Sequence, residues 1–374
     1  MEEFYINLYR PDSIKIWENE EVRKRLSWYY QVMRNEKPAK YLIVKKTPLP
    51  DDSKLNSLDE DGLWSLHKEV RKIFNDIRGE IINGSDLSSY PTPKISFLDL
   101  KIEIVNRMIR NCNFCERKCG IDREAGRRGF CGLNDETRVA SAFLHIGEEA
   151  PLVPSGTIFF TGCSFKCVYC QNWDISSNPF GGTLITPKQL ALLAKDLRRR
   201  GARNINYVGG NPDQQLHTII RSLEYMDINV PLLWNSNFYF TTETLEILLD
   251  IIDIWLPDFK YGNDNCAFRL SRVHRYFEVI TRNHKVIHDA GEEIIIRHLV
   301  LPNHLECCTK PVLRWIAENT PRALVNVMDQ YRPEHMVVKE PERFNDITRR
   351  LYRWEIEEAY SEAERLGLLF RPIS

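Results

Sequence analysis

The chain of 374 residues lacks a long hydrophobic run. A transmembrane helix needs about 20 consecutive apolar residues, and the best candidate, residues 245–256, is interrupted by Asp250 and Asp253. The first four residues, Met-Glu-Glu-Phe, also lack the basic and then apolar pattern of a signal peptide. We therefore expect a cytoplasmic protein.

The sequence also lacks an excess of charge of either sign. Lys and Arg number 51 against 52 for Asp and Glu, which gives a net charge of -1. Such a balance argues against a protein dedicated to coating nucleic acid. With 43% hydrophobic and 28% charged residues, the composition is that of a globular protein and excludes intrinsic disorder for most of the chain.

Cysteine, by contrast, is concentrated in one part of the sequence. Seven of the ten cysteines fall within the 59 residues from Cys112 to Cys170. Disulfide frameworks belong to short secreted chains, and this chain has neither property. Clustered cysteines in a reducing compartment are more often metal ligands, so we expect metal chemistry here.

From about residue 155, short apolar strands alternate with helices. Six such units predict a parallel sheet, either doubly wound or closed into a barrel, and six rather than eight indicate a partial (β/α)6 TIM-like barrel. The strands are expected at residues 157–160, 205–208, 230–234, 251–256, 293–300 and 324–328. A polar residue follows the end of each strand, where the mouth of a barrel would gather them: Cys163, Asn211, Asn235, Asp258, His304 and Asp329.

Four parts of the chain are expected. Residues 1–100 form an α-rich N-terminal extension, with one short strand candidate at 41–44. Residues 101–150 form a four-cysteine metal-binding lobe, and residues 151–340 form the barrel. Residues 341–374 contribute a C-terminal helix that packs on the barrel, expected over 345–366.

The strongest motif is the spacing C-x3-C-x2-C of Cys163, Cys167 and Cys170. Three thiolates in one compact loop can hold a [4Fe-4S] cluster and leave its fourth iron without a protein ligand. The alternative is a zinc site completed by a distant histidine. Because the loop follows the first strand of the barrel, at the expected catalytic mouth, its position favours the cluster.

These residues resemble the radical S-adenosylmethionine (SAM) superfamily, whose signature is C-x3-C-x-aromatic-C with Tyr169 in the aromatic position. The Phe-Thr-Gly-Cys segment before the loop and the Cys-Gln-Asn segment after it resemble the pyruvate formate-lyase activating enzyme-like (PflX-like) branch. The resemblance covers about residues 105–340. It implies an oxidoreductase in which SAM chelates the open iron and is cleaved reductively to a 5′-deoxyadenosyl radical that abstracts hydrogen from a substrate. It also implies an electron donor such as ferredoxin or flavodoxin.

The resemblance extends to the ends of the second and third strands. Gly209, Gly210 and Asn211 look like the Gly-Gly-Glu-Pro motif that contacts the amino group of SAM, although Asn211 replaces the carboxylate and loses its charge-assisted strength. A tight turn that requires glycine is the alternative. Asn235, Ser236 and Asn237 look like a further SAM-contacting segment, and here the alternative is a plain turn.

The fourth and fifth strands add charged candidates. Asp258 and Lys260 resemble the Asp-x-Lys motif found near SAM in the activating enzymes, against the alternative of a surface salt bridge. Arg297 and His298 are adjacent on a strand, so only one of them can face the lumen. The resemblance favours Arg297, as a partner of the SAM carboxylate.

A second group of cysteines precedes the barrel: Cys112, Cys115, Cys119 and Cys131. Four ligands in two groups with glycines between them predict a closed site, and structural zinc and a fully ligated iron–sulfur cluster both satisfy the pattern.

Two sets of residues are expected to have no role in the site. Cys266, Cys307 and Cys308 lack partners at ligand spacing and are interpreted as buried small hydrophobes. Glu148 and Glu149 are expected to be exposed, as paired glutamates usually are.

The sequence therefore predicts a radical SAM enzyme, with hydrogen abstraction from a glycine of a protein substrate as the nearest reaction. One alternative is modification of another peptide, nucleic-acid or lipid-like substrate, with the Cys112–Cys131 site as an auxiliary cluster. The alternative from another class is a zinc-bearing binding protein without redox chemistry.

Overall fold

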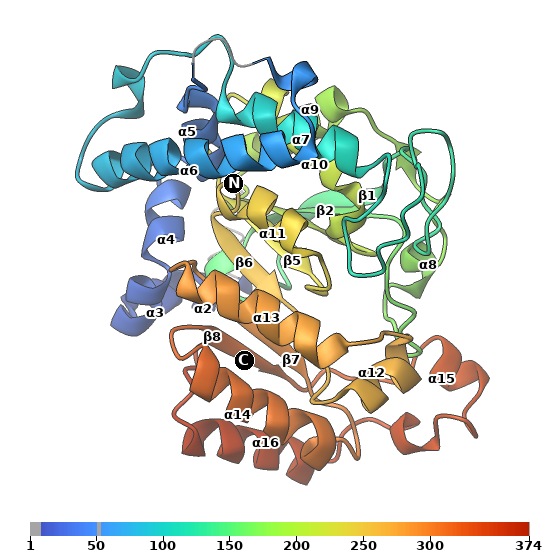
Figure 1. The fold of residues 1–374 in the computed structure, drawn as a ribbon. Helices are drawn as coiled ribbons and strands as arrows, with labels where there is room; N and C mark the ends of the chain where they lie inside the picture. Colours follow the sequence, from blue (N-terminus) through green and yellow to red (C-terminus); the bar gives the residue numbers. More distant parts are fainter. Residues whose placement is uncertain (1–8, 51–53, 374) are drawn as a thin grey trace.

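The computed structural model describes residues 9–50 and 54–373, and at its centre lies a mainly parallel sheet (Figure 1). The parallel strands follow the order of the chain, because β2 pairs with β4, β4 with β5, β5 with β6, and β7 with β8. Parallel bridges join β6 to β7. The partial barrel is therefore confirmed, with the strands β2 (Ser155–Phe160), β4 (Asn204–Gly209), β5 (Leu232–Ser236), β6 (Ile254–Pro257), β7 (Ile295–Leu299) and β8 (Leu324–Met328).

Two strands outside the six units extend the sheet on the β2 side. The strand β1 (Arg138–His145) pairs with β2 in the antiparallel direction, and β3 (Thr183–Leu184) pairs with β1. The sequence alternation contains no sign of either strand, since both precede or interrupt the first repeat.

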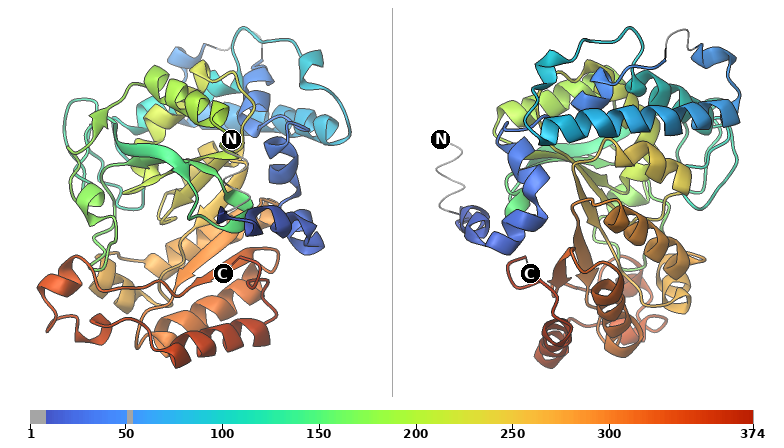
Figure 2. Two further views of the ribbon diagram at one scale, coloured as in Figure 1. Left: turned by 180° about the vertical axis from the view of Figure 1, so that it is seen from behind. Right: turned by 60° about the vertical axis from the view of Figure 1, so that its left-hand side comes forward.

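Helices connect the parallel strands on the outside of the sheet (Figures 1 and 2). Residues 264–289 form two helices rather than one, because Arg272 and Arg275 adopt left-handed backbone angles, with φ of 57° and 48°, and break the run. The connecting helices are α8 (Trp173–Ser176), α9 (Pro187–Arg199), α10 (Leu216–Ser222), α11 (Thr242–Leu249), α12 (Asp264–Ser271), α13 (Tyr276–Asp289) and α14 (Lys310–Asn319).

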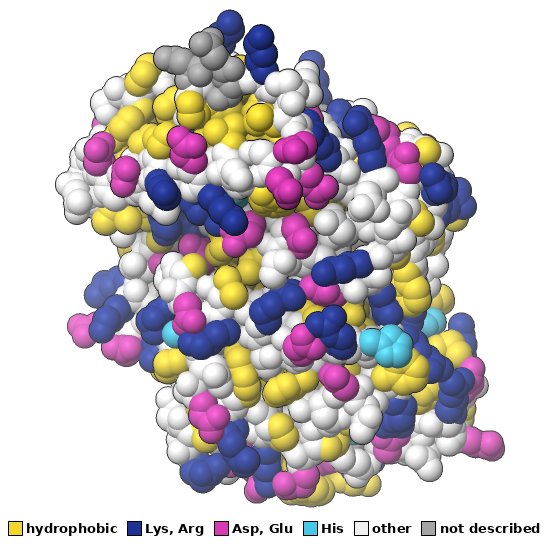
Figure 3. All heavy atoms as spheres, in the orientation of Figure 1, with side chains coloured by type: hydrophobic (Ala, Val, Ile, Leu, Met, Phe, Trp, Pro, Cys, Tyr) yellow, Lys and Arg dark blue, Asp and Glu magenta, His cyan; other side chains and the backbone are white. Residues whose placement is uncertain are grey.

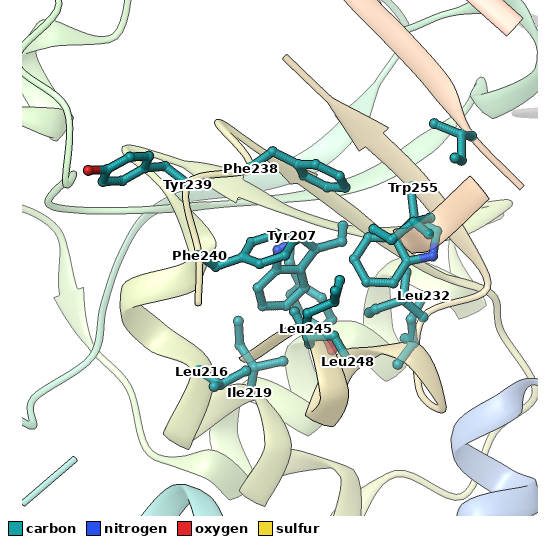
Figure 4. Packing of buried hydrophobic residues seen from close by; sticks show 14 of the residues in the cluster. Tyr207, Leu216, Ile219, Leu232, Phe238, Tyr239, Phe240, Leu245, Leu248 and Trp255 are labelled. Atoms are coloured by element: carbon teal, nitrogen blue, oxygen red, sulfur yellow. The ribbon is translucent and has the colours of Figure 1, made fainter. Parts of the chain in front are cut away.

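A hydrophobic core fills the space between the middle strands and their helices (Figure 4). Tyr207 of β4 and Trp255 of β6 are fully buried, and Leu216, Ile219 and Leu245 from α10 and α11 belong to the same cluster. Every residue of β5 and β6 is buried, so both faces of these strands are shielded from water, which is typical of parallel sheets.

The C-terminal segment packs on the barrel through α16, which contacts α14 (Figure 1). The expected helix over 345–366 begins later than predicted, because residues 345–347 form a separate 3-10 turn and Glu355 accepts a hydrogen bond of 2.8 Å from the backbone N–H of Tyr352 at the true start. The elements here are α15 (Met336–Lys339) and α16 (Arg353–Arg365).

The secondary-structure elements of the N-terminal extension are all helices. The strand candidate at 41–44 is wrong, since these residues lie in a helix whose Tyr41, Ile43 and Val44 are buried. A short apolar run does not distinguish a buried helix from a strand. The helices are α2 (Asp12–Lys15), α3 (Glu20–Arg25), α4 (Ser27–Met33), α5 (Lys40–Lys46), α6 (Glu60–Ile82) and α7 (Phe97–Met108).

Helix α4 covers the amino ends of the barrel strands. Glu293, which precedes β7, accepts hydrogen bonds from the backbone N–H groups of Trp28 and Tyr29. Asp253, which precedes β6, accepts from the indole of Trp28 at 2.8 Å, and Asn204 of β4 donates to the Tyr29 hydroxyl at 2.9 Å. This end of the barrel is therefore covered by the extension, which leaves the carboxyl ends of the strands for a site.

Glu293 should make this contact depend on pH. Burial raises its pKa to about 8, above the value of about 4.3 for an unfolded chain, so the stability that its neutral form contributes is complete below about pH 4 and is lost as the pH rises through about 8. We expect Glu293→Gln to have about the stability of wild type at about pH 5, because the neutral carboxyl and the amide each offer one carbonyl oxygen to the two N–H groups. Toward about pH 8.5 the variant should become more stable than wild type, by up to about 4 kcal/mol, because only the wild type must then ionise a buried group. Urea unfolding at both pH values checks this, and a difference that does not change with pH would contradict it.

The surface seen in Figure 3 carries charged side chains of both signs interspersed with apolar ones, in agreement with the balanced composition. Within residues 9–50 and 54–373, none of the helices combines the length and the apolar character needed to cross a bilayer.

Candidate functional site

The three-cysteine loop begins directly after β2 and ends at α8. Cys163 is buried, and its sulfur accepts hydrogen bonds from the backbone N–H of Phe165 at 3.3 Å and from the amide of Asn237 at 3.7 Å. Burial raises the pKa of the Cys163 thiol well above its usual range. The sulfur is thus held in place by donors from two different loops.

The other two cysteines of the loop are held by hydroxyl groups. Ser271, the last residue of α12, donates to the sulfur of Cys167 at 2.9 Å, and the Cys170 sulfur lies 3.5 Å from the Ser176 hydroxyl. Burial also raises the pKa of Cys167. Hydrogen bonds to cluster sulfurs are among the factors that set the potential of an iron–sulfur cluster.

Tyr169, in the aromatic position of the motif, connects the loop to α12. Its hydroxyl lies 2.7 Å from that of Tyr261, which in turn contacts the Ser271 hydroxyl. The polar end of Tyr169 is therefore engaged in holding the loop, while the residue also lines the cavity described next.

A cavity of about 240 Å³ opens at the carboxyl ends of the parallel strands. It brings together all of the residues that the sequence proposes for the cluster loop and for SAM, although these come from five separate segments. The lining includes Cys163, Cys167, Tyr169, Cys170, Gly209, Gly210, Asn211, Asn235, Ser236, Asp258, Lys260 and Arg297.

The two glycines at the end of β4 permit a close approach of backbones. A Cβ atom on Gly209 would collide with the backbone of Phe160, and one on Gly210 would collide with the carbonyl of Gly162, just before the three-cysteine loop. Gly209 also has φ of 120°. The turn therefore requires glycine at both positions, and the same residues line the cavity.

Asn237, the third residue of the segment expected to contact SAM, lies in this region as well. It lines the cavity, its side chain reaches the Cys163 sulfur, and its backbone N–H donates to Asn211 Oδ1 at 3.0 Å. The carbonyl oxygen of Asn211 thus has one partner within the protein and one lone pair left.

A partly buried group of charges lines the same cavity as the loop. Asp258 accepts from Arg297 Nε at 3.0 Å and from Lys260 Nζ at 2.7 Å, and Arg297 also donates to Asn235. Burial acts to raise the pKa of Asp258, but the charges of Arg297 and Lys260 outweigh it and lower the pKa overall. The cavity wall therefore carries two cations and one carboxylate, a net positive charge. His298 points the other way and contacts Phe259 O at 2.7 Å.

Glu148 and Glu149 are buried rather than exposed, which corrects the expectation from the sequence. Glu148 accepts from Asn206 of β4 at 2.9 Å, and Glu149 accepts from Asn326 of β8 at 2.8 Å. The segment after β1 thus reaches inward, where strand amides supply the hydrogen bonds that buried carboxylates need. Burial first, and then the neighbouring charge of Glu149, raise the pKa of Glu148.

The four-cysteine lobe lies between α7 and β1 and packs on the loop that follows β5. The backbone of Cys115 pairs with that of Phe240 in this loop as an isolated antiparallel β-bridge. A Cβ atom added to Gly129 would lie 3.6 Å from the sulfurs of both Cys119 and Cys131, so these two sulfurs lie close to Gly129. Cys112, Cys115 and Cys131 are buried, so the lobe turns most of its thiols inward.

Arg123 is the fully buried cation of this lobe. Its guanidinium lies 3.8 Å from the Cys112 sulfur and donates to the backbone carbonyls of Asn134 and Gln214. The lobe is thus fixed to the segment after β4, which carries cavity residues. Zinc and a fully ligated iron–sulfur cluster are the two proposals for this lobe.

Replacing Cys112 or Cys131 by alanine should remove metal from the lobe without emptying the three-cysteine loop, because the two motifs have separate ligand sets. Loss of an iron–sulfur cluster would lower iron by up to about four atoms per chain, whereas loss of a zinc ion would lower thermal stability and zinc content. Metal analysis of the wild type beside Cys112→Ala and Cys131→Ala distinguishes these results. If neither variant loses metal, the four cysteines do not form a site.

A partial barrel thus places a three-cysteine loop and a wall with two cations and one carboxylate around one cavity, and such a loop can hold an iron–sulfur cluster. The family model described as "Radical SAM superfamily" matches residues 157–316 of this chain. A relative from Methanocaldococcus jannaschii, the uncharacterized protein MJ0674, is 43% identical over 350 residues, covering 92% of this chain and 98% of the relative. The chain belongs to the radical SAM superfamily.

Other similar proteins match over shorter segments. The uncharacterized protein MJ0808 of the same organism is 25% identical over 217 residues, which is 52% of this chain and 61% of that protein. Streptococcus suis SuiB bound to the precursor peptide SuiA has a TM-score of 0.40 at 16% identity, covering 56% of this chain and 46% of SuiB. A domain of a pyruvate-formate lyase-activating enzyme from Bacteroides vulgatus has a TM-score of 0.33 at 15% identity, covering 44% of this chain and 95% of that domain. The chain spans about half the length of SuiB.

Proposed function

We propose that this protein is a radical SAM enzyme of the activating enzyme-like branch, which abstracts hydrogen from a glycine of a protein substrate. The observation that carries the proposal is the convergence of the cluster loop and the SAM-contact segments on one cavity. When bound, the cluster and SAM supply one-electron cleavage of the sulfonium bond of SAM. Superfamily membership favours this proposal over a zinc-bearing binding protein.

The residues of the cavity have separable tasks in this proposal. Cys163, Cys167 and Cys170 hold the cluster, and their N–H and O–H donors fix the sulfurs. Arg297 and Lys260 place positive charge beside the cavity, which suits the carboxylate of SAM. Asp258 holds both cations through hydrogen bonds of 3.0 and 2.7 Å and fixes their direction.

Exposed aromatic side chains beside the loop support a macromolecular substrate. Trp173 follows the loop and is 37% exposed, and Phe130 is 43% exposed. Lys339 lies over the Trp173 ring at 5.1 Å, and Arg117 lies over the Phe130 ring at 3.9 Å. Aromatic and Arg side chains at a surface are enriched where proteins bind one another.

The position of the four-cysteine lobe favours a second candidate, modification of another substrate with an auxiliary cluster. Thr241 and Thr244, which follow β5, donate to backbone carbonyls of Asn113 and Phe114 in the lobe at 2.8 and 2.9 Å. The lobe is therefore attached at the carboxyl end of β5, the end of the barrel at which the cavity opens.

The test is hydrogen transfer under anaerobic conditions. Cluster-loaded protein receives SAM and either dithionite or a reduced flavodoxin as electron donor, and candidate protein substrates carry deuterated glycine. We expect deuterium in 5′-deoxyadenosine. Absence of 5′-deoxyadenosine would contradict reductive SAM cleavage, whereas 5′-deoxyadenosine that gains deuterium from another substrate would favour the second candidate.

A further inference from the structure

The three cysteines outside both motifs are not isolated hydrophobes, which corrects the interpretation from the sequence. Together with a histidine they form a compact group, in which the potential ligand atoms of Cys266, His304, Cys307 and Cys308 all lie within 4.8 Å of one another. Cys266 comes from the first turn of α12, after β6. The other three follow β7, about 40 positions later in the chain.

A π-helix explains how adjacent cysteines reach one point. Residues Leu305–Thr309 form η7, a π-helical turn in which the N–H groups of Cys308 and Thr309 both donate to the carbonyl of His304. The sulfurs of Cys307 and Cys308 lie 3.9 Å apart, at 3.3 and 3.6 Å from His304 Nδ1. π-helical turns are rare in proteins, and those that do occur are often found at functional sites.

The distances agree with a single tetrahedral ion. Zinc bonds of about 2.3 Å to sulfur and about 2.0–2.1 Å to nitrogen place two sulfurs about 3.8 Å apart, and a sulfur and a nitrogen about 3.6 Å apart. The Cys266 sulfur lies 3.9 Å from that of Cys307 and 3.8 Å from His304 Nδ1. A [4Fe-4S] cube, with each thiolate on a different iron, would hold the sulfurs farther apart.

The imidazole of His304 is oriented as a metal ligand would be. Its Nε2 lies 2.9 Å from Asp346 Oδ2, while Nδ1 faces the three sulfurs. A carboxylate on one ring nitrogen fixes the tautomer that leaves the other nitrogen free to bind a metal. Asp346 is itself held by Arg269, which pairs with it through Nη1 at 3.0 Å.

We propose that Cys266, His304, Cys307 and Cys308 form a structural zinc site, separate from the three-cysteine loop and from the Cys112–Cys131 group. The closed set of three thiolates and one imidazole leaves no position for a substrate, which is the property of structural zinc. Cys307 is exposed, so the site is open to zinc from solvent.

The site would brace the cluster loop through α12. Cys266 lies at the start of this helix, and its other end contacts the loop, because Leu270 O accepts from the N–H of Val168 at 2.8 Å and Ser271 donates to Cys167. A zinc ion at the group would tie the connections after β6 and β7 together and hold α12 against the loop.

Zinc analysis of anaerobically purified full-length protein tests the proposal. We expect Cys307→Ser and Cys266→Ser each to contain about one zinc less per chain than wild type, with iron unchanged. Glu306→Gln is the matched control, because Glu306 lies on the same turn, is exposed and pairs with Lys310. Asp346→Asn should keep the ligands and weaken zinc affinity about 10- to 100-fold, measured by competition with a chelator.

Two further measurements keep the test decisive if a variant folds poorly. In wild type, Cys307 should resist alkylation until the zinc is chelated, and Co²⁺ added to zinc-depleted protein should give the absorption bands of a tetrahedral thiolate site. If Cys131→Ala loses all of the zinc that the wild type contains, the proposal is overturned. A disulfide between Cys266 and Cys307 in the wild type would overturn it as well. Loss of iron instead of zinc in Cys307→Ser would also overturn it.

Discussion

Replacing Cys163, Cys167 or Cys170 by alanine is expected to remove the iron of the loop and to abolish reductive cleavage of SAM. Each thiolate of such a loop holds a different iron, so that none of the remaining two can replace the missing one. The structure adds that each sulfur has its own donor, with Ser271 on Cys167 and the Phe165 N–H on Cys163. Neighbouring cysteines are therefore not free to move into the vacated place.

Iron and sulfide analysis and the yield of 5′-deoxyadenosine measure this result. Ser176→Ala is the matched control, because it removes only the hydroxyl that lies 3.5 Å from the Cys170 sulfur and keeps all three ligands. This control should retain its iron. Formation of 5′-deoxyadenosine at the wild-type rate by any of the three alanine variants would refute the radical SAM assignment.

The barrel was predictable from the sequence because its signals are local. Each strand is a short apolar run that is followed by a polar residue, and the carboxyl ends of parallel strands meet at one edge of the sheet. Residues as distant as Cys163 and Asp258 were therefore expected at one mouth, and the structure places both on one cavity. The roles of these residues remain predictions.

Features that depend on contacts between distant segments were not predictable. Cys266 has no ligand spacing to His304 in the sequence, and only the π-helical turn and the approach of two loops bring them to 3.8 Å. Glu148 looks like a surface residue because its partner Asn206 lies on another strand. The helix around Tyr41 is buried on most of its faces, so its apolar residues are consecutive and do not show the spacing of an amphipathic helix.

Carboxylates at the two ends of the barrel have different partners. The carboxylates of Asp253 and Glu293, at the amino ends of the strands, bind backbone and indole N–H groups of α4. At the opposite end, Asp258 holds two cations beside the cavity. The first kind of contact holds the extension on the barrel, whereas only the second kind lines the cavity.

The second large effect is expected for Arg297→Ala, which should weaken SAM binding while leaving the iron content intact. Arg297 acts on the ligand's carboxylate in our proposal, and loss of a charged hydrogen bond costs about 1.5–3 kcal/mol, or about 10- to 100-fold in affinity. The structure shows that its removal does not strand the carboxylate of Asp258, since Lys260 remains 2.7 Å away. The variant should therefore stay folded and keep its cluster.

Calorimetric titration of cluster-loaded protein with SAM measures the change, and two variants sharpen it. Arg297→Lys keeps the charge but loses the planar fork, so its affinity should lie between those of wild type and alanine. His298→Ala is the matched control, because this neighbouring side chain points away from the cavity to Phe259 O and Thr309. It should lower stability and leave SAM affinity unchanged. An Arg297→Ala variant with the wild-type dissociation constant would show that the guanidinium serves only to hold Asp258 and Asn235, and that the carboxylate of SAM is bound elsewhere.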